Sequence, residues 1–169
     1  MRPRHRLTLV ALALALVGAG SAHVYRNDAM HVRAFAAPLG WELAPQASYP
    51  RLLASYSHQD GGKLTLAGQK APPRATALAL AEQSRTPLER QGFASIKIAR
   101  DGDRATIDAT LDGGRRFMKQ VYLVAGGYAF VVTLIAPVAA AAHATPDFDE
   151  AVRSLQLTDT ASPDGNAAR

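Results

Sequence analysis

The side chains best suited to bind a metal ion or to exchange protons near neutral pH are the histidines, His5, His23, His31, His58 and His143. The chain has no cysteine, so thiolate ligands are absent. No two histidines stand at a short metal-ligand spacing, and the sequence therefore predicts no preformed zinc site. His58, two residues before Asp60 in an expected hairpin turn, is one weak candidate. A solvated turn is the alternative interpretation.

Catalytic signatures are also lacking. A serine nucleophile in an α/β-hydrolase occupies a Gly-x-Ser-x-Gly turn, and no serine of this chain does. The stretch DGDRATID, residues 101–108, superficially resembles a calcium loop. It lacks the central glycine and closing glutamate of that motif, so a hairpin turn is favoured. We therefore expect no enzymatic activity, no metal and no cofactor.

Candidate partner-binding residues are Trp41 and the basic cluster Arg115, Arg116 and Lys119, with Phe117 between them. The cluster could dock an acidic protein or anionic lipid headgroups. Its alternative role is a charged strand start that discourages edge-to-edge pairing. Trp41, the sole tryptophan, could be an exposed binding anchor or a core residue beside a sheet.

The N-terminus has the pattern of a secretory signal peptide. Arg2, Arg4 and Arg6 precede an apolar run, and small residues follow up to Ala22, after which we expect cleavage. An uncleaved inner-membrane anchor is the alternative, although residues 7–22 fall short of the roughly 20 residues that span a bilayer. Without those arginines, 16 basic residues face 14 acidic ones, a charge of +2 that argues against nucleic acid. A periplasmic or secreted location follows, with membrane association only if the segment is retained.

The remaining chain is expected to hold a lead-in over residues 23–33, a domain over 34–158 and a disordered tail over 159–169. Alternating runs on either side of DGG, residues 60–62, predict a hairpin. Helical spacing follows over residues 71–92, and Pro87 predicts a kink or two abutting helices, the second capped by Thr86. Gly92 should close this segment.

The most apolar stretch of the domain, residues 121–137, has Gly126 and Gly127 near its centre. β-Branched and aromatic residues dominate it, which favours two central strands over one membrane helix. Further strands are expected over 93–111, joined by Asp-Gly turns. After Pro137 we expect a short helix and then a separate amphipathic helix capped by Thr145.

This order of elements resembles the PsbP/Mog-like superfamily, with its DcrB/LpqN-like bacterial envelope proteins. The resemblance rests on a Pro-x-Gly-Trp opening at residues 38–41, a helix ending in Gly-Phe, a GGYAFVVTL core strand and a final FDEAVRSLQL helix. It implies an α+β fold in which helices flank an antiparallel β-sheet, an α/β/α sandwich. It implies no catalytic residues, because these four sequence motifs are markers of the fold and not of an active site.

The functional expectation is a non-enzymatic exported envelope protein that acts as an accessory or protein-interaction module. Its partner would be another envelope protein, bound on a sheet face or in a groove between sheet and helix. The alternative is a carrier of a small apolar ligand in a cavity between the sheet and the helices. A hydrolase would need a nucleophile and a base clustered in a cleft.

Overall fold

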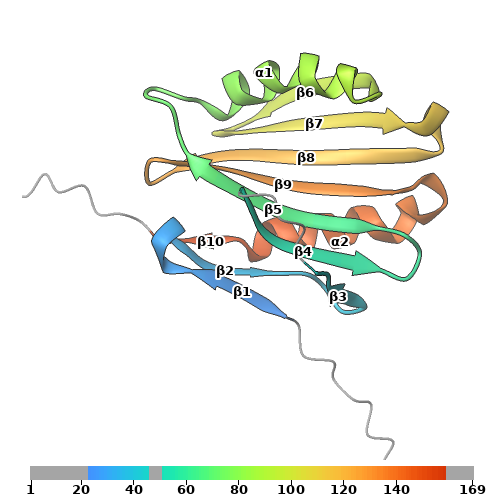
Figure 1. Ribbon diagram of the computed structural model, residues 1–169, viewed down its shortest axis with the longest axis horizontal. Coiled ribbons are helices and arrows are strands. Elements are labelled where there is room, and N and C mark those ends of the chain that lie inside the picture. Colours follow the sequence, from blue (N-terminus) through green and yellow to red (C-terminus); the bar gives the residue numbers. More distant parts are fainter. Residues whose placement is uncertain (1–22, 46–50, 159–169) are drawn as a thin grey trace, which may run out of the picture.

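The computed structural model describes residues 23–45 and 51–158 of the chain. A seven-stranded antiparallel sheet lies between two helices, and a three-stranded sheet packs beside the second helix (Figure 1). This arrangement confirms the predicted α+β class with an antiparallel sheet flanked by helices. Both the predicted signal peptide, residues 1–22, and the predicted tail, residues 159–169, lie outside the described residues.

The large sheet has the strand order β3-β4-β5-β9-β8-β7-β6. Its strands are β3 (Trp41–Leu43), β4 (Leu52–His58), β5 (Lys63–Lys70), β6 (Ala94–Asp101), β7 (Arg104–Leu111), β8 (Arg116–Ala125) and β9 (Tyr128–Pro137). The predicted hairpin forms β4 and β5, and the apolar run forms β8 and β9. Gly126 and Gly127 both have positive φ, 57° and 78°, as a two-residue hairpin turn requires. β9 lies inside the sheet, as predicted.

The small sheet joins the two ends of the described chain. Its order is β1 (Val24–Asn27), β2 (Val32–Ala36) and β10 (Gln156–Leu157), with the 3-10 turn η1 (Asp28–Met30) between the first two strands. The expected lead-in, residues 23–33, is thus a strand, a turn and the start of a second strand. β1 pairs with β2 nearby in the sequence, whereas β10, the other neighbour of β2, lies more than 100 positions away.

Each helix is continuous across a proline, which contradicts the two abutting helices expected as one alternative at Pro87 and the separate helix expected to begin at Thr145. α1 (Ala77–Arg90) contains Pro87, and α2 (Ala141–Ser154), which follows the 3-10 turn η3 (Val138–Ala140), contains Pro146. Thr76 caps α1, since its hydroxyl accepts from the Ala79 amide at 3.2 Å. The carbonyls that lose a partner belong to residues 83 and 142. Both residues are exposed, so water can replace the missing hydrogen bonds.

Alternation along the central strands divides the core into two layers. On β9, Phe130, Val132 and Leu134 point toward α2 and the small sheet. Val131 and Ile135 point toward α1. The short turn η2 (Asp112–Gly114) connects β7 to β8 at one end of these layers. Within residues 23–45 and 51–158, no helix has the length and apolarity needed to cross a membrane.

Candidate metal-binding cluster and surface groove

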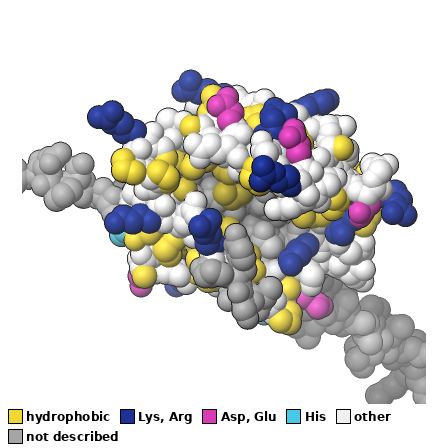
Figure 2. Space-filling view, turned by 45° about the horizontal axis from the view of Figure 1, so that its top comes forward, with side chains coloured by type: hydrophobic (Ala, Val, Ile, Leu, Met, Phe, Trp, Pro, Cys, Tyr) yellow, Lys and Arg dark blue, Asp and Glu magenta, His cyan; other side chains and the backbone are white. Residues whose placement is uncertain are grey.

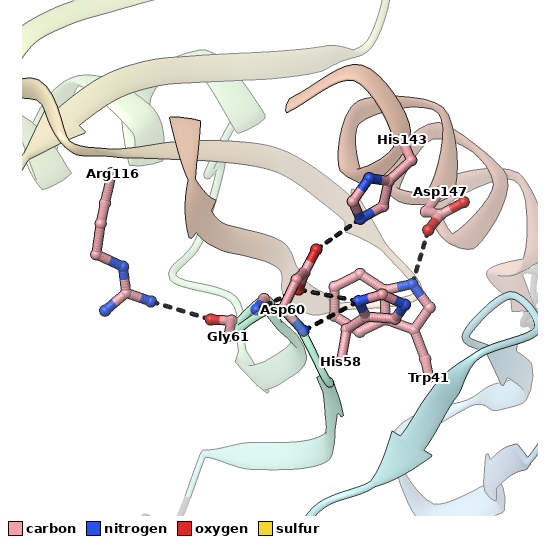
Figure 3. A network of polar contacts seen from close by, with 8 residues as sticks. Trp41, His58, Asp60, Gly61, Arg116, His143 and Asp147 are labelled. Atoms are coloured by element: carbon pink, nitrogen blue, oxygen red, sulfur yellow. Dashed lines mark hydrogen bonds and ion pairs between the residues drawn. The ribbon is translucent and has the colours of Figure 1, made fainter. Parts of the chain in front are cut away.

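Two histidines and an aspartate meet where the β4–β5 turn touches α2 (Figure 3). His58 ends β4, Asp60 lies in the turn, and His143 is in the first turn of α2. The Nδ1 atom of His58 is 2.9 Å from Oδ1 of Asp60, and Nε2 of His143 is 2.6 Å from Oδ2 of the same carboxylate. The three potential ligand atoms lie within 4.8 Å of one another. We call these three residues the His-Asp-His cluster.

Asp60 is held in place by the turn that contains it. The backbone N–H of Gly62 donates to its Oδ1 atom at 2.8 Å. Burial by itself raises the pKa of this carboxyl, but hydrogen bonds from Gly62, His58 and His143 outweigh it and leave the pKa below its ordinary value. The side chains of His58 and Asp60 are 15% and 22% exposed, whereas that of His143 is 48% exposed. The cluster is therefore reachable from solvent on the His143 side.

Aromatic packing fixes the imidazole of His58. Its ring centroid lies 5.4 Å from the ring of Trp41 and 5.2 Å from the ring of His143. The indole Nε1–H of Trp41 donates to Oδ2 of Asp147 at 2.9 Å. Because Asp147 follows His143 by four residues on α2, this bond ties the same helix face to the sheet. Trp41, His58 and α2 therefore form one connected unit.

Trp41 does not form the exposed anchor that the sequence allowed. Its side chain is only 5% exposed and belongs to the core on the α2 side of the sheet. Burial follows from the position of β3, whose Trp41 pairs with His58 and so faces α2. The alternative interpretation, core packing beside the sheet, describes its position.

The basic cluster of the sequence is divided between two faces. Arg116 and Lys119 are an odd number of positions apart on β8, so their side chains leave opposite sides of the sheet. Lys119 forms an ion pair with Asp108 at 2.8 Å on the α2 side. Arg116 reaches the carbonyl of Gly61 at 3.4 Å, and its buried Nε atom has no partner. Arg115 is exposed and donates from Nε to the Asp112 carbonyl at 3.1 Å.

Sequence reasoning found His58 and Asp60 but missed His143. That histidine is separated from Asp60 by 83 positions and reaches it only because α2 crosses the end of the hairpin. One local signal exists, since His143 and Asp147 share a helix face at a spacing of four. Nothing in the sequence indicates which hairpin that face meets.

A second feature is a groove on the α1 side of the sheet. It has a volume of about 350 Å³ and lies between α1 and the strands β5, β8 and β9. Figure 2 shows the hollow on this face, with hydrophobic side chains inside it and Lys and Arg side chains around it. The walls mix apolar and hydrogen-bonding side chains: Ala67, Gln69, Leu80, Gln83, Ser84, Pro87, Gln120, Tyr122, Ala129, Val131 and Thr133. Arg51 is the one charged residue among those lining it.

The chemistry available at these two places differs. Within the described residues, no hydrogen bond joins a serine or threonine hydroxyl to a histidine side chain, so a serine–histidine pair is not assembled. The His-Asp-His cluster offers two imidazole nitrogens and a carboxylate, which together can hold a metal ion. The groove offers amides, hydroxyls and apolar patches, which suit a polypeptide.

Several solved structures are similar to this chain. The solution structure of cyanobacterial PsbP (CyanoP) from Synechocystis is 14% identical, with a TM-score of 0.61 over 86% of this chain and 98% of that one. A crystal structure from Bacteroides thetaiotaomicron is 12% identical, with a TM-score of 0.51 over 75% of this chain and 45% of that one. LpqN, involved in cell envelope biogenesis of Mycobacterium tuberculosis, has 16% identity and a TM-score of 0.45 over 83% of each chain.

No protein-family model matches the sequence, and no curated protein matches it either. The likeness to CyanoP nevertheless covers nearly the whole of that protein. The chain therefore has the PsbP-like fold, which confirms the resemblance at the level of architecture. At these identities the likeness establishes the fold and leaves the function to the residues of this chain.

Proposed function

We propose that this protein is a non-enzymatic accessory protein of the bacterial cell envelope that binds an acidic protein segment in the groove beside α1. The observation that carries the proposal is the groove itself, which lies between α1 and the strands β5, β8 and β9. The PsbP-like architecture and the predicted signal peptide support an exported accessory role. Neither depends on a catalytic site.

The composition of the groove supports a peptide occupant. Gln69 and Gln83 each offer both a donor and an acceptor, which a polypeptide backbone can use. The amide of Gln120 is already engaged by Thr133 and Tyr122. Apolar contacts are available beside them from Leu80 and Val131. A purely apolar ligand would leave the amide groups without partners, at a cost in free energy. The carrier function is therefore the weaker alternative.

Charge supports an acidic partner. Arg51 lines the groove and is exposed. Figure 2 shows basic side chains surrounding the hollow in greater abundance than acidic ones. Such a rim favours association with a negatively charged surface and makes the association rate depend on ionic strength. Arg116 faces the same side, whereas Lys119 does not.

The experiment places a photoreactive residue at Gln83 in the full-length protein and crosslinks it in living cells. Arg153 is the matched control position, since it is also an exposed helical residue lining a cleft, but on the α2 side. We expect one envelope protein to be captured from position 83 and not from position 153. The purified partner should bind with lower affinity when Arg51→Glu is introduced and when salt is raised.

Two results would overturn this proposal. One is capture of the same species with equal yield from both positions. The other is recovery of only the uncrosslinked chain from position 83 while the protein is folded and exported. Because Gln83 is exposed, the substitution itself is not expected to disturb folding.

A further inference from the structure

We propose that His58, Asp60 and His143 bind one divalent transition-metal ion, for which Zn²⁺ is the best match. The proposal is independent of the groove, which lies on the other side of the sheet. The three residues supply two imidazole nitrogens and one carboxylate from two segments that are far apart in the sequence. Three protein ligands plus a water molecule make a complete tetrahedral zinc shell.

Ligand chemistry selects the class of ion. Imidazole nitrogen suits zinc, copper, nickel and iron, whereas calcium and magnesium require sites made mostly of oxygen. Of the three ligands here, only Asp60 is an oxygen donor. Among the transition metals, zinc accepts a tetrahedral nitrogen and oxygen set without a change of oxidation state.

The distances are close to those that a bound ion would impose. Zinc–ligand bonds of about 2.0–2.2 Å put tetrahedral ligand atoms roughly 3.3 Å apart. The two contacts to Asp60 measure 2.9 Å and 2.6 Å, so each must open by less than about 1 Å. His143 is half exposed and can make this adjustment by rotating its side chain. His58 and Asp60 need move little.

The surroundings of the cluster already orient its ligands. Trp41 packs against the ring of His58, and the backbone at Gly40 passes so close that a Cβ atom there would lie 3.4 Å from its Nε2 atom. The Gly62 amide fixes the Asp60 carboxylate. Supporting groups of this kind hold metal ligands in position and commonly change affinity by 10–100-fold when removed.

A bound ion would connect α2 to the β4–β5 turn. In the structure α2 already meets this part of the sheet through the His143–Asp60 pair, the ring contact between His143 and His58, and the hydrogen bond from Trp41 on β3 to Asp147. An ion that binds only the folded chain stabilises it by mass action. The thermal midpoint of unfolding should therefore rise when Zn²⁺ is added.

The sole tryptophan gives a direct test, because the ring of Trp41 lies 5.4 Å from that of His58. The full chain is purified without a histidine tag and stripped with a chelator. Co²⁺ is then titrated, and we expect saturable quenching of tryptophan fluorescence at one ion per chain. Diamagnetic Zn²⁺ should reverse the quenching by competition. Titration calorimetry with Zn²⁺ alone should give the same stoichiometry.

Variants decide whether the cluster is the site. His143→Ala and Asp60→Asn should each weaken Zn²⁺ binding at least about tenfold and abolish the rise in thermal midpoint. His31→Asn is the control, because it removes an imidazole outside the cluster and asparagine tolerates the positive φ of 57° found there. Its Zn²⁺ affinity should equal that of the wild type. Far-UV circular dichroism checks that each variant is folded.

The proposal is overturned if the stripped wild-type chain does not bind Zn²⁺, or if folded His143→Ala binds it with wild-type affinity. Equal losses in His31→Asn and His143→Ala would also overturn it. These measurements use the chain without any partner. Their failure would leave the docking proposal intact, and failed crosslinking at Gln83 would leave the metal site intact.

Discussion

The two faces of the large sheet are covered by different elements. The core on the α2 side includes the fully buried aromatic residues Phe35, Tyr56, Phe130 and Phe148. On the other face, α1 contributes the buried Ala77, Ala81 and Leu88 to a cluster that includes Ile107, Met118 and Tyr122 of the sheet. A helix and a second sheet cover the α2 side, whereas one helix covers the α1 side and leaves a groove beside it.

This difference shows how one sheet can serve two purposes. Large aromatic residues bury the most apolar area and dominate the free energy of folding. α1 packs on β6, β7 and β8, toward one edge of the sheet. That position leaves the part of the same face near β5 and β9 without a helix among the described residues. The α2 side is thus the stabilising face, and the α1 side is available for binding.

The largest expected effect is truncation of Phe148 on the stabilising face. Phe148 is 2% exposed and lies in the core between α2 and the sheet. Phe148→Ala should lower the free energy of unfolding by about 3–5 kcal/mol. Leu80→Ala, at a half-buried position in the groove, should cost about 1–2 kcal/mol, because less apolar area is lost. Urea denaturation measures both. Equal losses would contradict the division into two faces.

The next effect tests the close approach of α1. Ala81 is fully buried against the sheet, so no space is available for a larger side chain. Ala81→Leu should destabilise the fold by about 1–3 kcal/mol through overpacking. Glu82→Leu, at the adjacent exposed position, is the matched control and should change stability by less than about 0.5 kcal/mol. If Ala81→Leu is neutral, α1 does not depend on small residues for its position.

Most of the fold was predictable because local chemistry determined it. Turn residues such as Asp60 to Gly62 and the pair Gly126 and Gly127 marked the hairpins, and period-two alternation marked the strands. The errors had separate causes. The strand over Val24–Asn27 forms by pairing with β2, although its own residues show only weak alternation. Pro87 stays inside one helix because the carbonyl that loses its partner belongs to the exposed residue 83.

The candidate sites were harder to predict, and three cases show why. The division of Arg116 from Lys119 follows from strand alternation and was readable once both were placed on one strand. The meeting of His143 with Asp60 was not readable, since it depends on where α2 crosses the sheet. Trp41 illustrates a third case, in which the residue type fits both a core and an anchor.

A smaller effect concerns the hydroxyl of Tyr122 at the floor of the groove. Tyr122 is 5% exposed, and its hydroxyl donates to Oε1 of Gln120 at 2.9 Å. Burial, only partly opposed by a hydrogen bond with Ser84, raises the pKa of Tyr122 above 10.0. A tyrosine whose pKa is higher in the folded state than in the unfolded state stabilises the fold at pH values below its unfolded-state pKa. That stabilisation is lost as the pH rises through the folded-state pKa.

Tyr122→Phe should therefore be less stable than the wild type at pH 8, by about 1 kcal/mol for the lost hydrogen bond. Above pH 10 the Tyr122 hydroxyl ionises more readily in the unfolded wild type than in the folded protein, and this favours unfolding. The variant has no hydroxyl at this position and is not affected. The difference in urea midpoint should shrink as the pH rises from about 10 to 11. Burial also raises the pKa of Tyr56, but Tyr56 is present in both proteins, so its effect cancels from the difference between them. A constant gap over this range would contradict burial of the Tyr122 hydroxyl.

The smallest expected effect is charge reversal at Lys119. Its ion pair with Asp108 is largely exposed, with side chains 27% and 53% accessible, and such pairs contribute about 0–1 kcal/mol. Lys119→Glu should therefore change stability by no more than about 1 kcal/mol and leave partner capture from position 83 unchanged. Arg51→Glu, on the α1 side, should weaken capture without a larger loss of stability. If Lys119→Glu abolished partner binding while Arg51→Glu preserved it, the α2 side would be the docking face. The groove beside α1 would then be a consequence of where α1 packs and not a binding surface.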